Sequence, residues 1–494
     1  MKDWRSWVYA GVIAALVVVT SAPGATVPPA RAEIPPHLGY GVNVRFQNHV
    51  DSLFAPLGFE WLKLWEEYDP IPTARYPYQV LFLIDCTQRS DDMEEWGDAV
   101  ETIAEAGRGL IEAYEICNEP NRAEWLSKDV SPFQPDPSLY AQMLQVAHER
   151  IKAVDPAAIV VSAGLAPVGR IEGTCGGWNG NNCSAMDERE YARQMFLLGA
   201  GDYFDAFGYH PYGFAYAPET DPTSVSNGFA FRGVEVMHDL LGQYGLEHKP
   251  IWATEFSWLR DPSADGAGPE WCHRDPAYED NFGWMDVPEV QQANYITRSF
   301  QYADENWPWM GAMFVWNLDW HNYGWLCNPA RYFSVRKDND TDPGAPALAY
   351  DALATIEKRP GHFGPRLAIA SNGITFLADV DEPGIITATL RPWNAGYQVL
   401  TWTASVAAGL QVTGTGTLGV QVTPTLVITT GLQGTPLTVT MDSTGYTTGT
   451  FIGHITVTAT TTDVLDTPQA VPVTLLVVPE VYRAYLPVTL RSAS

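Results

Sequence analysis

The chain has 494 residues, which is more than one domain ordinarily needs and predicts two folded units, each long enough to bury a core. Its 58 acidic and 29 basic side chains give a net charge of −29, which would repel nucleic-acid phosphates and anionic lipid. This balance argues against both as partners and favours a neutral polymer. The 18 Trp and 23 Tyr agree with a polymer whose rings stack on aromatic faces, although an aromatic-rich core would also use them.

The amino-terminal segment has the pattern of a secretory signal. Lys2 and Arg5 precede an apolar run from Val8 to Val19, and small residues then lead to Ala30-Arg31-Ala32, an A-x-A cleavage site. The run is short for a transmembrane helix, and no second apolar span follows it. We therefore expect a signal peptide over residues 1–32 and a secreted, extracellular protein without membrane insertion, with an uncleaved anchor at the cell surface as the alternative.

Four of the six cysteines are expected to form disulfides in an exported protein. Cys175 and Cys183 bracket a loop rich in Gly and Asn that has few other means of staying ordered, so we expect them to be bridged. Cys272 and Cys327 lie in loops after neighbouring predicted strands, which makes a second bridge reasonable.

The other two cysteines fall in or beside predicted core strands. We expect Cys86 and Cys117 to be plain buried thiols. The chain has no C-x-x-C pair or His-rich tract of the kind that holds structural zinc, and we expect no metal and no cofactor.

From residue 38 to 358, short β-branched or aromatic runs alternate with amphipathic helical stretches such as Tyr140–Ala153 and Val290–Ala303. This alternation predicts a parallel sheet wrapped by helices. Eight such units favour a (β/α)8 TIM barrel over residues 33–358, with a doubly wound open sheet as the alternative. The predicted strands are Gly39–Arg45, Trp61–Trp65, Val80–Asp85, Leu110–Asn118, Ile159–Ala163, Phe204–His210, Ile251–Glu255 and Gly311–Asn317.

Beyond residue 358 the composition changes. A stretch rich in Gly and Pro over residues 359–366 predicts a linker. Residues 367–478 are rich in Thr, Val and Gly, and their alternating segments predict a smaller all-β sandwich of the immunoglobulin type. Residues 479–494 form a polar tail. The sequence Gly414-Thr-Gly-Thr-Leu-Gly419 fits a dinucleotide-binding pattern literally, but it opens no helix and is read as turn glycines.

Two predicted strands end in a glutamate. The fourth run closes in Asn118-Glu119-Pro120, and the seventh is interrupted at its exit by Glu255. In a barrel both carboxylates would face the cavity at the carboxyl ends of the strands. Hydrolysis of a glycosidic bond needs one carboxyl that gives a proton and one carboxylate that attacks the anomeric carbon. Either glutamate alone would more often be a salt-bridge partner or a strand-end cap.

With these motifs the sequence resembles clan A glycoside hydrolases, especially barrels of the family 5 and family 39 type, over residues 38–358. The resemblance implies that Glu119 is the acid/base, that Asn118 binds the 2-hydroxyl of the sugar and that Glu255 is the nucleophile. Two further landmarks occur in the same order as in the clan, Gly208-Tyr-His-Pro-Tyr-Gly213 and Phe314-Val-Trp-Asn-Leu-Asp319.

These landmarks imply three more substrate-binding residues. His210 and Tyr212 would line the cleaved site, with the Tyr212 hydroxyl donating to Glu255, and Trp316 would stack on the sugar. A structural histidine beside a Pro turn and a Trp that fills a barrel layer are the alternatives. The chain departs from family 5 at the second strand, which lacks the usual Arg, and Lys63 or Arg45 could replace it.

The sequence therefore predicts a secreted, retaining glycoside hydrolase that cleaves β-linked glycans by double displacement. We expect the carboxyls of Glu119 and Glu255 to stand about 5 Å apart, with Glu119 protonated and Glu255 ionised near working pH. The alternative is a non-catalytic glycan-binding or adhesive surface protein on the same barrel. The carboxy-terminal unit resembles a BACON-type immunoglobulin-like module, which would bind glycan or act as a spacer.

Overall fold

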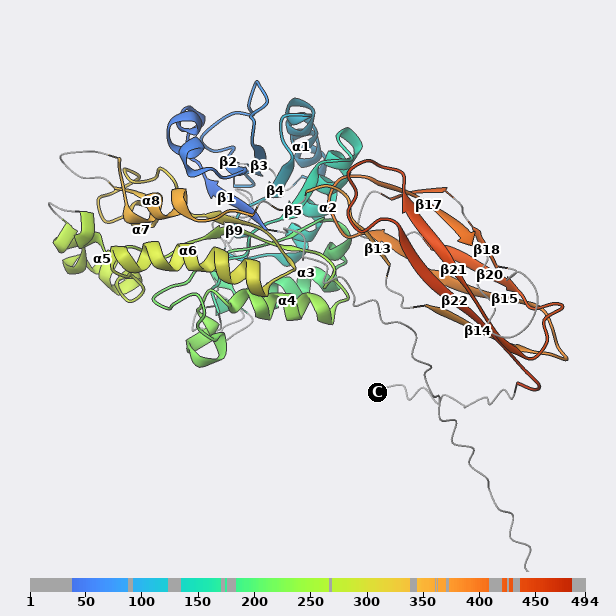
Figure 1. Ribbon diagram of the computed structural model, residues 1–494. Coiled ribbons are helices and arrows are strands. Elements are labelled where there is room, and N and C mark those ends of the chain that lie inside the picture. Colours follow the sequence, from blue (N-terminus) through green and yellow to red (C-terminus); the bar gives the residue numbers. More distant parts are fainter. Residues whose placement is uncertain are drawn as a thin grey trace, which may run out of the picture. The chain divides into compact units, whose positions relative to one another are not determined.

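The computed structural model describes residues 38–87, 92–122, 135–169, 174–175, 184–265, 269–337, 344–359, 361, 363–369, 373–407, 420–423, 426–429 and 436–481 (Figure 1). The predicted signal peptide and most of the polar tail lie outside these residues. Across the described part of the chain, no helix has the length and apolar character needed to cross a bilayer.

Eight parallel strands form a nearly closed barrel in the order β5-β4-β3-β2-β1-β10-β9-β8. Isolated parallel bridges between Val161 and Ala206 and between Leu165 and Tyr209 connect its two edges. The strands read as continuous apolar runs because both of their faces are covered. Their bounds are Gly39–Asn43 (β1), Trp61–Trp65 (β2), Gln79–Ile84 (β3), Ala113–Ile116 (β4), Ile159–Ser162 (β5), Phe207–Tyr209 (β8), Ile251–Phe256 (β9) and Met310–Val315 (β10). The predicted TIM-type barrel is confirmed, and each predicted strand overlaps one of these eight.

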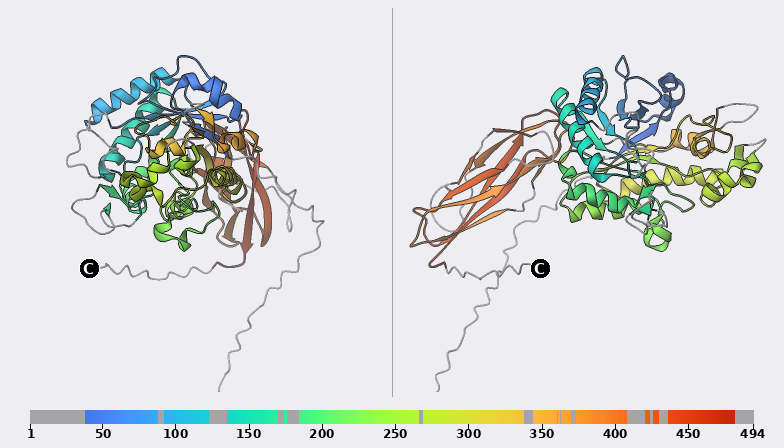
Figure 2. Two further views of the ribbon diagram at one scale, coloured as in Figure 1. Left: turned by 90° about the vertical axis from the view of Figure 1, so that its left-hand side faces the viewer. Right: turned by 180° about the vertical axis from the view of Figure 1, so that it is seen from behind.

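Helices surround the barrel strands on the outside, as the views in Figures 1 and 2 show. Three of the long helices begin directly after an aspartate, Asp92, Asp136 or Asp187, whose side chain accepts hydrogen bonds from the first free backbone N–H groups. The helices are Met93–Gly107 (α1), Pro137–Val154 (α2), Glu188–Leu197 (α3), Gly233–Gln243 (α4), Pro276–Tyr278 (α5), Glu289–Asn306 (α6), Pro329–Phe333 (α7) and Leu348–Thr355 (α8).

Short strands and single helical turns lie in the loops of the barrel. The two-residue strands are Thr174–Cys175 (β6), Ala185–Met186 (β7), Arg336–Lys337 (β11) and Ala345–Pro346 (β12). Single turns of 3-10 or π helix lie at Gln47–His49, Val50–Phe54, Ala55–Leu57, Ala200–Asp202, Pro222–Ser224, Ser226–Gly228, Pro262–Asp265, Pro269–Arg274 and Glu279–Gly283.

The remaining strands form a smaller all-β region with its own core, as predicted. A five-stranded sheet has the order β14-β22-β21-β17-β19, a three-stranded sheet the order β15-β20-β18, and β13 pairs with β16. Alternate side chains of β22 are buried, and Trp402 lies fully buried in the core between residues of both larger sheets. The bounds are Leu367–Ile369 (β13), Ile374–Asp379 (β14), Ile385–Leu390 (β15), Pro392–Asn394 (β16), Leu400–Ala407 (β17), Val420–Thr423 (β18), Leu426–Thr429 (β19), Leu437–Asp442 (β20), Gly449–Ala459 (β21) and Gln469–Val478 (β22).

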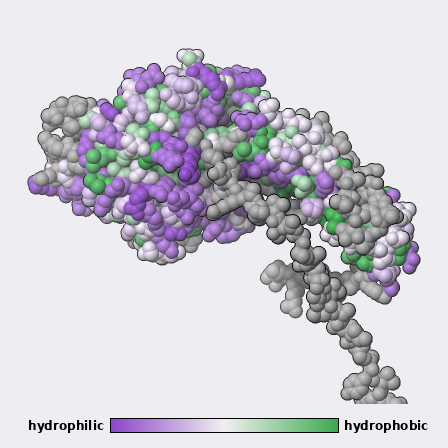
Figure 3. Space-filling model, viewed as in Figure 1, coloured by the Kyte–Doolittle hydropathy of each residue, from purple (hydrophilic) through white to green (hydrophobic). Residues whose placement is uncertain are grey.

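The visible surface of the barrel is mostly hydrophilic. Figure 3 shows mostly hydrophilic residues on the face of the barrel that is in view, with hydrophobic residues scattered among them. Scattered apolar side chains are ordinary on a protein surface and mark no site by themselves.

The disulfides correct one prediction and agree with another. Cys86 and Cys117, expected to be free thiols, are bridged, with their Cα atoms 5.0 Å apart. They follow the ends of β3 and β4, which are neighbours in the sheet, so the two side chains meet at one edge of the barrel. Cys272 and Cys327 are bridged as predicted. The expected Cys175–Cys183 bridge lies outside the described residues, because Cys183 is not among them.

The Cys86–Cys117 bridge closes a loop with a sequence separation of 31 residues. By the loss of loop-closure entropy in the unfolded chain, such a bridge contributes about 3–4 kcal/mol to the free energy of unfolding. We expect the Cys86→Ala, Cys117→Ala double variant to unfold at clearly lower temperature than the parent when followed by circular dichroism. An unchanged melting temperature, or free Cys86 and Cys117 thiols in non-reducing mass mapping of the parent, would contradict the bridge.

Candidate active site

The fold brings the two predicted glutamates to the same mouth of the barrel. Glu119 follows β4, and its backbone N–H donates to the carbonyl of Gly164 at 3.1 Å. Its φ of 41° lies in the left-handed region, a strained conformation for a residue with a side chain that is common at functional sites. Glu255 lies near the carboxyl end of β9. The exposed fractions of Glu119 and Glu255 are 7% and 4%, so both carboxylates are largely removed from water.

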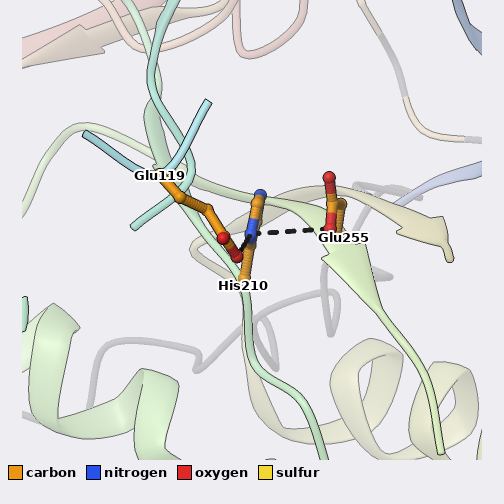
Figure 4. A group of neighbouring side chains, drawn as sticks. All are labelled: Glu119, His210 and Glu255. Atoms are coloured by element: carbon orange, nitrogen blue, oxygen red, sulfur yellow. Dashed lines mark hydrogen bonds and ion pairs between the residues drawn. The ribbon is translucent and has the colours of Figure 1, made fainter. Parts of the chain in front are cut away.

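His210 lies between the two carboxylates, as Figure 4 shows. Its Nδ1 is 2.9 Å from Glu119 Oε1 and 3.6 Å from Glu255 Oε2. Its Nε2 is 3.1 Å from the hydroxyl of Thr254, so both ring nitrogens have partners. One oxygen of each glutamate and a ring nitrogen of His210 all lie within 4.8 Å of one another. This upper bound is compatible with the expected separation of about 5 Å between the two carboxyls.

Burial alone would lower the pKa of His210, but the carboxylates of Glu255 and Glu119 outweigh it and leave that pKa above its ordinary value. A protonated imidazole in this position donates to Glu119 and neutralises part of the charge between the two carboxylates.

Tyr212 donates a hydrogen bond from its hydroxyl to Glu255 Oε2 at 2.7 Å, which is the contact that the resemblance to clan A implied. Burial and the nearby Glu255 carboxylate raise the pKa of Tyr212 well above its ordinary value, so its hydroxyl keeps its proton. A hydroxyl that stays protonated fixes the orientation of the Glu255 carboxylate. The other oxygen of that carboxylate, Oε1, has no hydrogen-bond partner among the described residues.

A buried lysine lies behind Glu255. Lys63 Nζ is 2.6 Å from Glu115 Oε2 and 3.7 Å from Glu255 Oε1, and the side chains of Lys63 and Glu115 are fully buried. Of the two candidates that the sequence left open for the missing Arg, Lys63 therefore lies beside Glu255. The guanidinium of Arg45 lies instead over the rings of Phe46, Tyr68 and Tyr323.

Arg122 forms an ion pair with the other glutamate. Its Nη1 is 3.1 Å from Glu119 Oε2, and its side chain is 42% exposed. Burial raises the pKa of Glu119, but Arg122 and His210 outweigh it and hold that pKa below its ordinary value. For Glu255, burial prevails over His210 and Lys63 and raises the pKa. The two pKa values are thus shifted in the opposite order to the expected one, because Arg122 and His210 lower that of Glu119 and burial raises that of Glu255.

Glu119 and Glu255 line a cavity of about 990 Å³, at the upper end of the range for ligand sites. Asn118 and Tyr212 line it, as does the half-buried Trp316. The side-chain oxygen of Asn118 is buried without a hydrogen-bond partner in the described part of the chain, although buried polar atoms are ordinarily paired. The fold thus brings all six predicted site residues together, with His210 buried beneath the cavity between the two glutamates.

Two residues of the site, Glu115 and Gly164, escaped the sequence analysis. Glu115 interrupts an apolar strand, as Lys63 does, and that signal could have identified the two as a buried ion pair. Gly164 has a steric role, since a Cβ there would lie 2.1 Å from His210 Nε2 and 2.4 Å from Thr254 Oγ1. Nothing in the sequence distinguishes this glycine from those in turns.

Among the residues that the structure describes, two groups of side chains have the spacing of a metal site. One is Glu119, His210 and Glu255, and the other is Asp261, His273 and Asp286, which lies in the segment after β9. In the first group, one oxygen of Glu255 already accepts a hydrogen bond from Tyr212, and one oxygen of Glu119 accepts one from Arg122. The second is held together by His273, whose Nε2 lies 3.1 Å from Asp261 and 3.7 Å from Asp286.

The buried Lys63–Glu115 pair gives a stability prediction. Lys63→Met leaves the Glu115 charge buried without its partner, which typically costs about 3–5 kcal/mol of unfolding free energy. The double variant Lys63→Met, Glu115→Gln removes both charges and is expected to recover most of this loss. Urea denaturation of the parent, both single variants and the double variant measures the coupling free energy between the two side chains. Additive effects of the two changes would show that Lys63 and Glu115 do not stabilise each other.

No family model matches the sequence, and no curated protein matches it. Among solved structures, the chain is similar to a GH128 endo-β-1,3-glucanase from Amycolatopsis mediterranei in complex with laminaritriose, with 15% identity and a TM-score of 0.39 over 64% of this chain and 98% of that chain. A glucosidase from Croceicoccus marinus has 14% identity and a TM-score of 0.42 over 85% of each chain. β-Glucuronidase 2 from Bacteroides uniformis has 11% identity and a TM-score of 0.39 over 90% of this chain and 46% of that chain.

Proposed function

We propose that the chain is a retaining glycoside hydrolase that cleaves β-linked glycans. The observation that carries this proposal is the distance between the carboxylates, since oxygens of Glu119 and Glu255 lie within 4.8 Å in an open cavity. Retaining enzymes hold their two carboxyls about 5–5.5 Å apart, whereas inverting enzymes need about 6.5–9.5 Å to admit a water molecule.

In the first step Glu255 attacks the anomeric carbon while Glu119 gives a proton to the glycosidic oxygen. The carbon–oxygen bond to the leaving group breaks, and an ester forms between the sugar and Glu255. Tyr212 and Lys63 support this role, because they hold one oxygen of Glu255 in place and set a positive charge beside the other.

In the second step Glu119 takes a proton from water, and the oxygen of that water attacks the same anomeric carbon. The ester to Glu255 breaks, and the sugar leaves with the β configuration of the substrate. The ion pair with Arg122 suits this step, in which Glu119 must be ionised.

For the first step Arg122 has to leave Glu119. His210 occupies Glu119 Oε1 and Arg122 occupies Oε2, so no oxygen is available to a glycosidic oxygen while both contacts persist. Arg122 is the exposed partner, and we infer that the bound sugar displaces it. Its departure raises the pKa of Glu119 and makes that residue a proton donor.

Two further residues bind the sugar in this proposal. The unpaired oxygen of Asn118 accepts a hydrogen bond from a sugar hydroxyl, and the ring of Trp316 packs against the apolar face of the pyranose. The alternative of a glycan-binding protein without turnover would use the same two contacts, but it would have no need of two carboxylates whose oxygens lie within 4.8 Å of each other in one cavity.

The organisation of the chain is part of the same proposal. Residues 33–358 would be the hydrolase, 359–366 a linker, 367–478 an accessory domain of the BACON type and 479–494 a tail. The signal over residues 1–32 would export the protein, and the two bridges among the described cysteines are typical of an extracytoplasmic compartment.

Turnover of aryl β-glycosides and soluble β-glycans tests the proposed activity. We expect the purified chain to hydrolyse at least one member of each panel, to release the β anomer first when followed by proton NMR, and to keep its activity in EDTA. The Glu255→Gln variant should be inactive. Binding of the same glycans without hydrolysis would support the non-catalytic alternative.

The Arg122–Glu119 ion pair predicts a change in pH dependence. A general acid works only below its pKa, so kcat/KM falls as the pH rises through the pKa of Glu119. Arg122→Met removes the positive charge that lowers this pKa, and the alkaline limb of the profile should therefore move to higher pH. Arg122→Lys, which keeps the charge, should leave the limb close to that of the parent. A shift to lower pH in Arg122→Met would contradict the ion pair.

A further inference from the structure

The cavity has aromatic side chains on both sides of Glu119 and Glu255. One group is built around Trp316 and contains Trp65, Tyr68, Trp320 and Tyr323, and we call it the Trp316 cluster. The other contains Phe214, Phe229 and Trp284, and we call it the Trp284 stack. All members of both groups line the same cavity as Glu119 and Glu255.

The strand order separates the two groups. Glu119 follows β4 and Glu255 lies in β9, so a line between them crosses the mouth of the barrel. On one side of this line lie β10, β1 and β2, which carry or lead into the residues of the Trp316 cluster. On the other side lies β8, and the segment after it holds Phe214 and Phe229. Trp284 comes from the segment after β9 and stacks on Phe214.

The rings of the Trp284 stack lie nearly parallel, face to face. The ring centroids of Phe214 and Trp284 are 5.5 Å apart with an angle of 17° between the planes, and those of Phe214 and Phe229 are 4.8 Å apart at 25°. Trp284 donates its indole N–H to the carbonyl of Asn281 at 3.0 Å, which fixes the ring. The side chain is nevertheless 51% exposed. A large ring that is held on one side and open to a cavity on the other can accept the face of a sugar ring.

We propose that the Trp284 stack is a sugar-binding subsite remote from the cleaved bond, and that the enzyme is endo-acting on long β-glycans. This inference rests on the proposed function. A glycan that crosses the line between Glu119 and Glu255 would contact the Trp316 cluster with the units on one side of the cleaved bond and the Trp284 stack with units on the other. An exo-acting enzyme binds more than one sugar unit on only one side of the cleaved bond, so it would need only one of these two surfaces.

The test compares substrates of different length in the Trp284→Ala variant. For the β-glycan cleaved fastest among β-1,3-glucan, β-1,4-glucan, β-mannan and β-xylan, kcat/KM on its hexasaccharide should fall about tenfold, a loss of about 1.4 kcal/mol in binding. On the aryl β-monoglycoside, which cannot reach the stack, kcat/KM should stay at the parent value. Trp284→Phe keeps a ring and should recover most of the loss.

Trp271→Ala is the matched control, because Trp271 is also exposed, at 41%, and does not line the cavity. It should behave as the parent on both substrates. Equal losses on the hexasaccharide and the monoglycoside in Trp284→Ala would assign the stack to loop structure and overturn the subsite. No loss on either would overturn it too.

The polymer provides the second readout. Endo action lowers the viscosity of the soluble glycan long before many reducing ends are released, and the first products are mixed oligosaccharides. Release of only one short product from the chain end would overturn endo action. Hydrolysis of the aryl glycoside by the parent keeps these outcomes separate from a failure of the proposed function, in which no substrate is cleaved at all.

Discussion

Glu255→Ala is expected to lower the turnover of every substrate by about 10⁵-fold, because removal of a nucleophile eliminates the covalent route. Azide fits the space left by the carboxylate and can attack the anomeric carbon from the face that Glu255 occupied. Activity should therefore return in azide, and the product should be the glycosyl azide of inverted, α configuration. Rates with and without azide on an aryl β-glycoside, with NMR of the product, measure both effects.

A matched control for this variant is Glu305→Ala, which removes an exposed carboxylate from the outer helix α6 and should behave as the parent. Thermal unfolding of both variants checks that the fold is kept. A rescued product of β configuration in Glu255→Ala would exchange the roles of the two glutamates, and an undiminished rate would contradict the hydrolase proposal altogether.

The loss of rate in Glu119→Ala should depend on the leaving group of the substrate. A substrate with a poor leaving group needs the proton from Glu119, so its rate should fall by about 10²–10⁴-fold, the usual contribution of general acid catalysis. An activated aryl glycoside hardly needs the proton in its first step, and the hydrolysis of the glycosyl–enzyme should then limit its rate. Azide should accelerate that second step and give a glycosyl azide of retained, β configuration.

A series of aryl glycosides with different leaving groups distinguishes the acid/base role of Glu119 from a structural role. A damaged fold would slow all aryl glycosides by a similar factor, whereas loss of the acid gives a steep dependence on the pKa of the leaving phenol. A flat series in Glu119→Ala, together with no response to azide, would exclude Glu119 as the acid/base.

The barrel was predictable because its strands have a strong local signal. Buried parallel strands are continuous apolar runs, and a charged residue at the end of such a run stands out, as Glu119 and Glu255 do. The order of the strands then determines which side chains meet at the mouth, so that two residues far apart in the sequence could be placed in one cavity.

The ionic contacts of the site depend on side-chain geometry that no local pattern records. Arg122 stands three residues after Glu119 in a loop, and its ion pair lowers the pKa of that carboxyl. Burial raises the pKa of Glu255, so the two shifts run opposite to the expected order. The Cys86–Cys117 bridge was missed for a related reason. Both cysteines look like buried core residues, and their proximity follows only from the adjacency of β3 and β4.

The site also depends on a close approach of backbone to side chain. Gly164 leaves room for the imidazole of His210, whose two nitrogens contact Glu119 and Thr254. A Gly164→Ala change would force His210 to move, although position 164 is far from both motifs in the sequence. Such steric requirements become visible only when β5 and β8 are placed side by side.

The most direct test of the account is to trap the covalent intermediate. A 2-deoxy-2-fluoro β-glycoside with a dinitrophenolate leaving group, made with the sugar of the best aryl substrate, should form a stable ester with the enzyme, because fluorine slows the second step. Peptide mapping by mass spectrometry should find the added sugar on Glu255. Labelling of Glu119, or turnover of substrates with inversion and no labelled peptide, would contradict a retaining mechanism with Glu255 as its nucleophile.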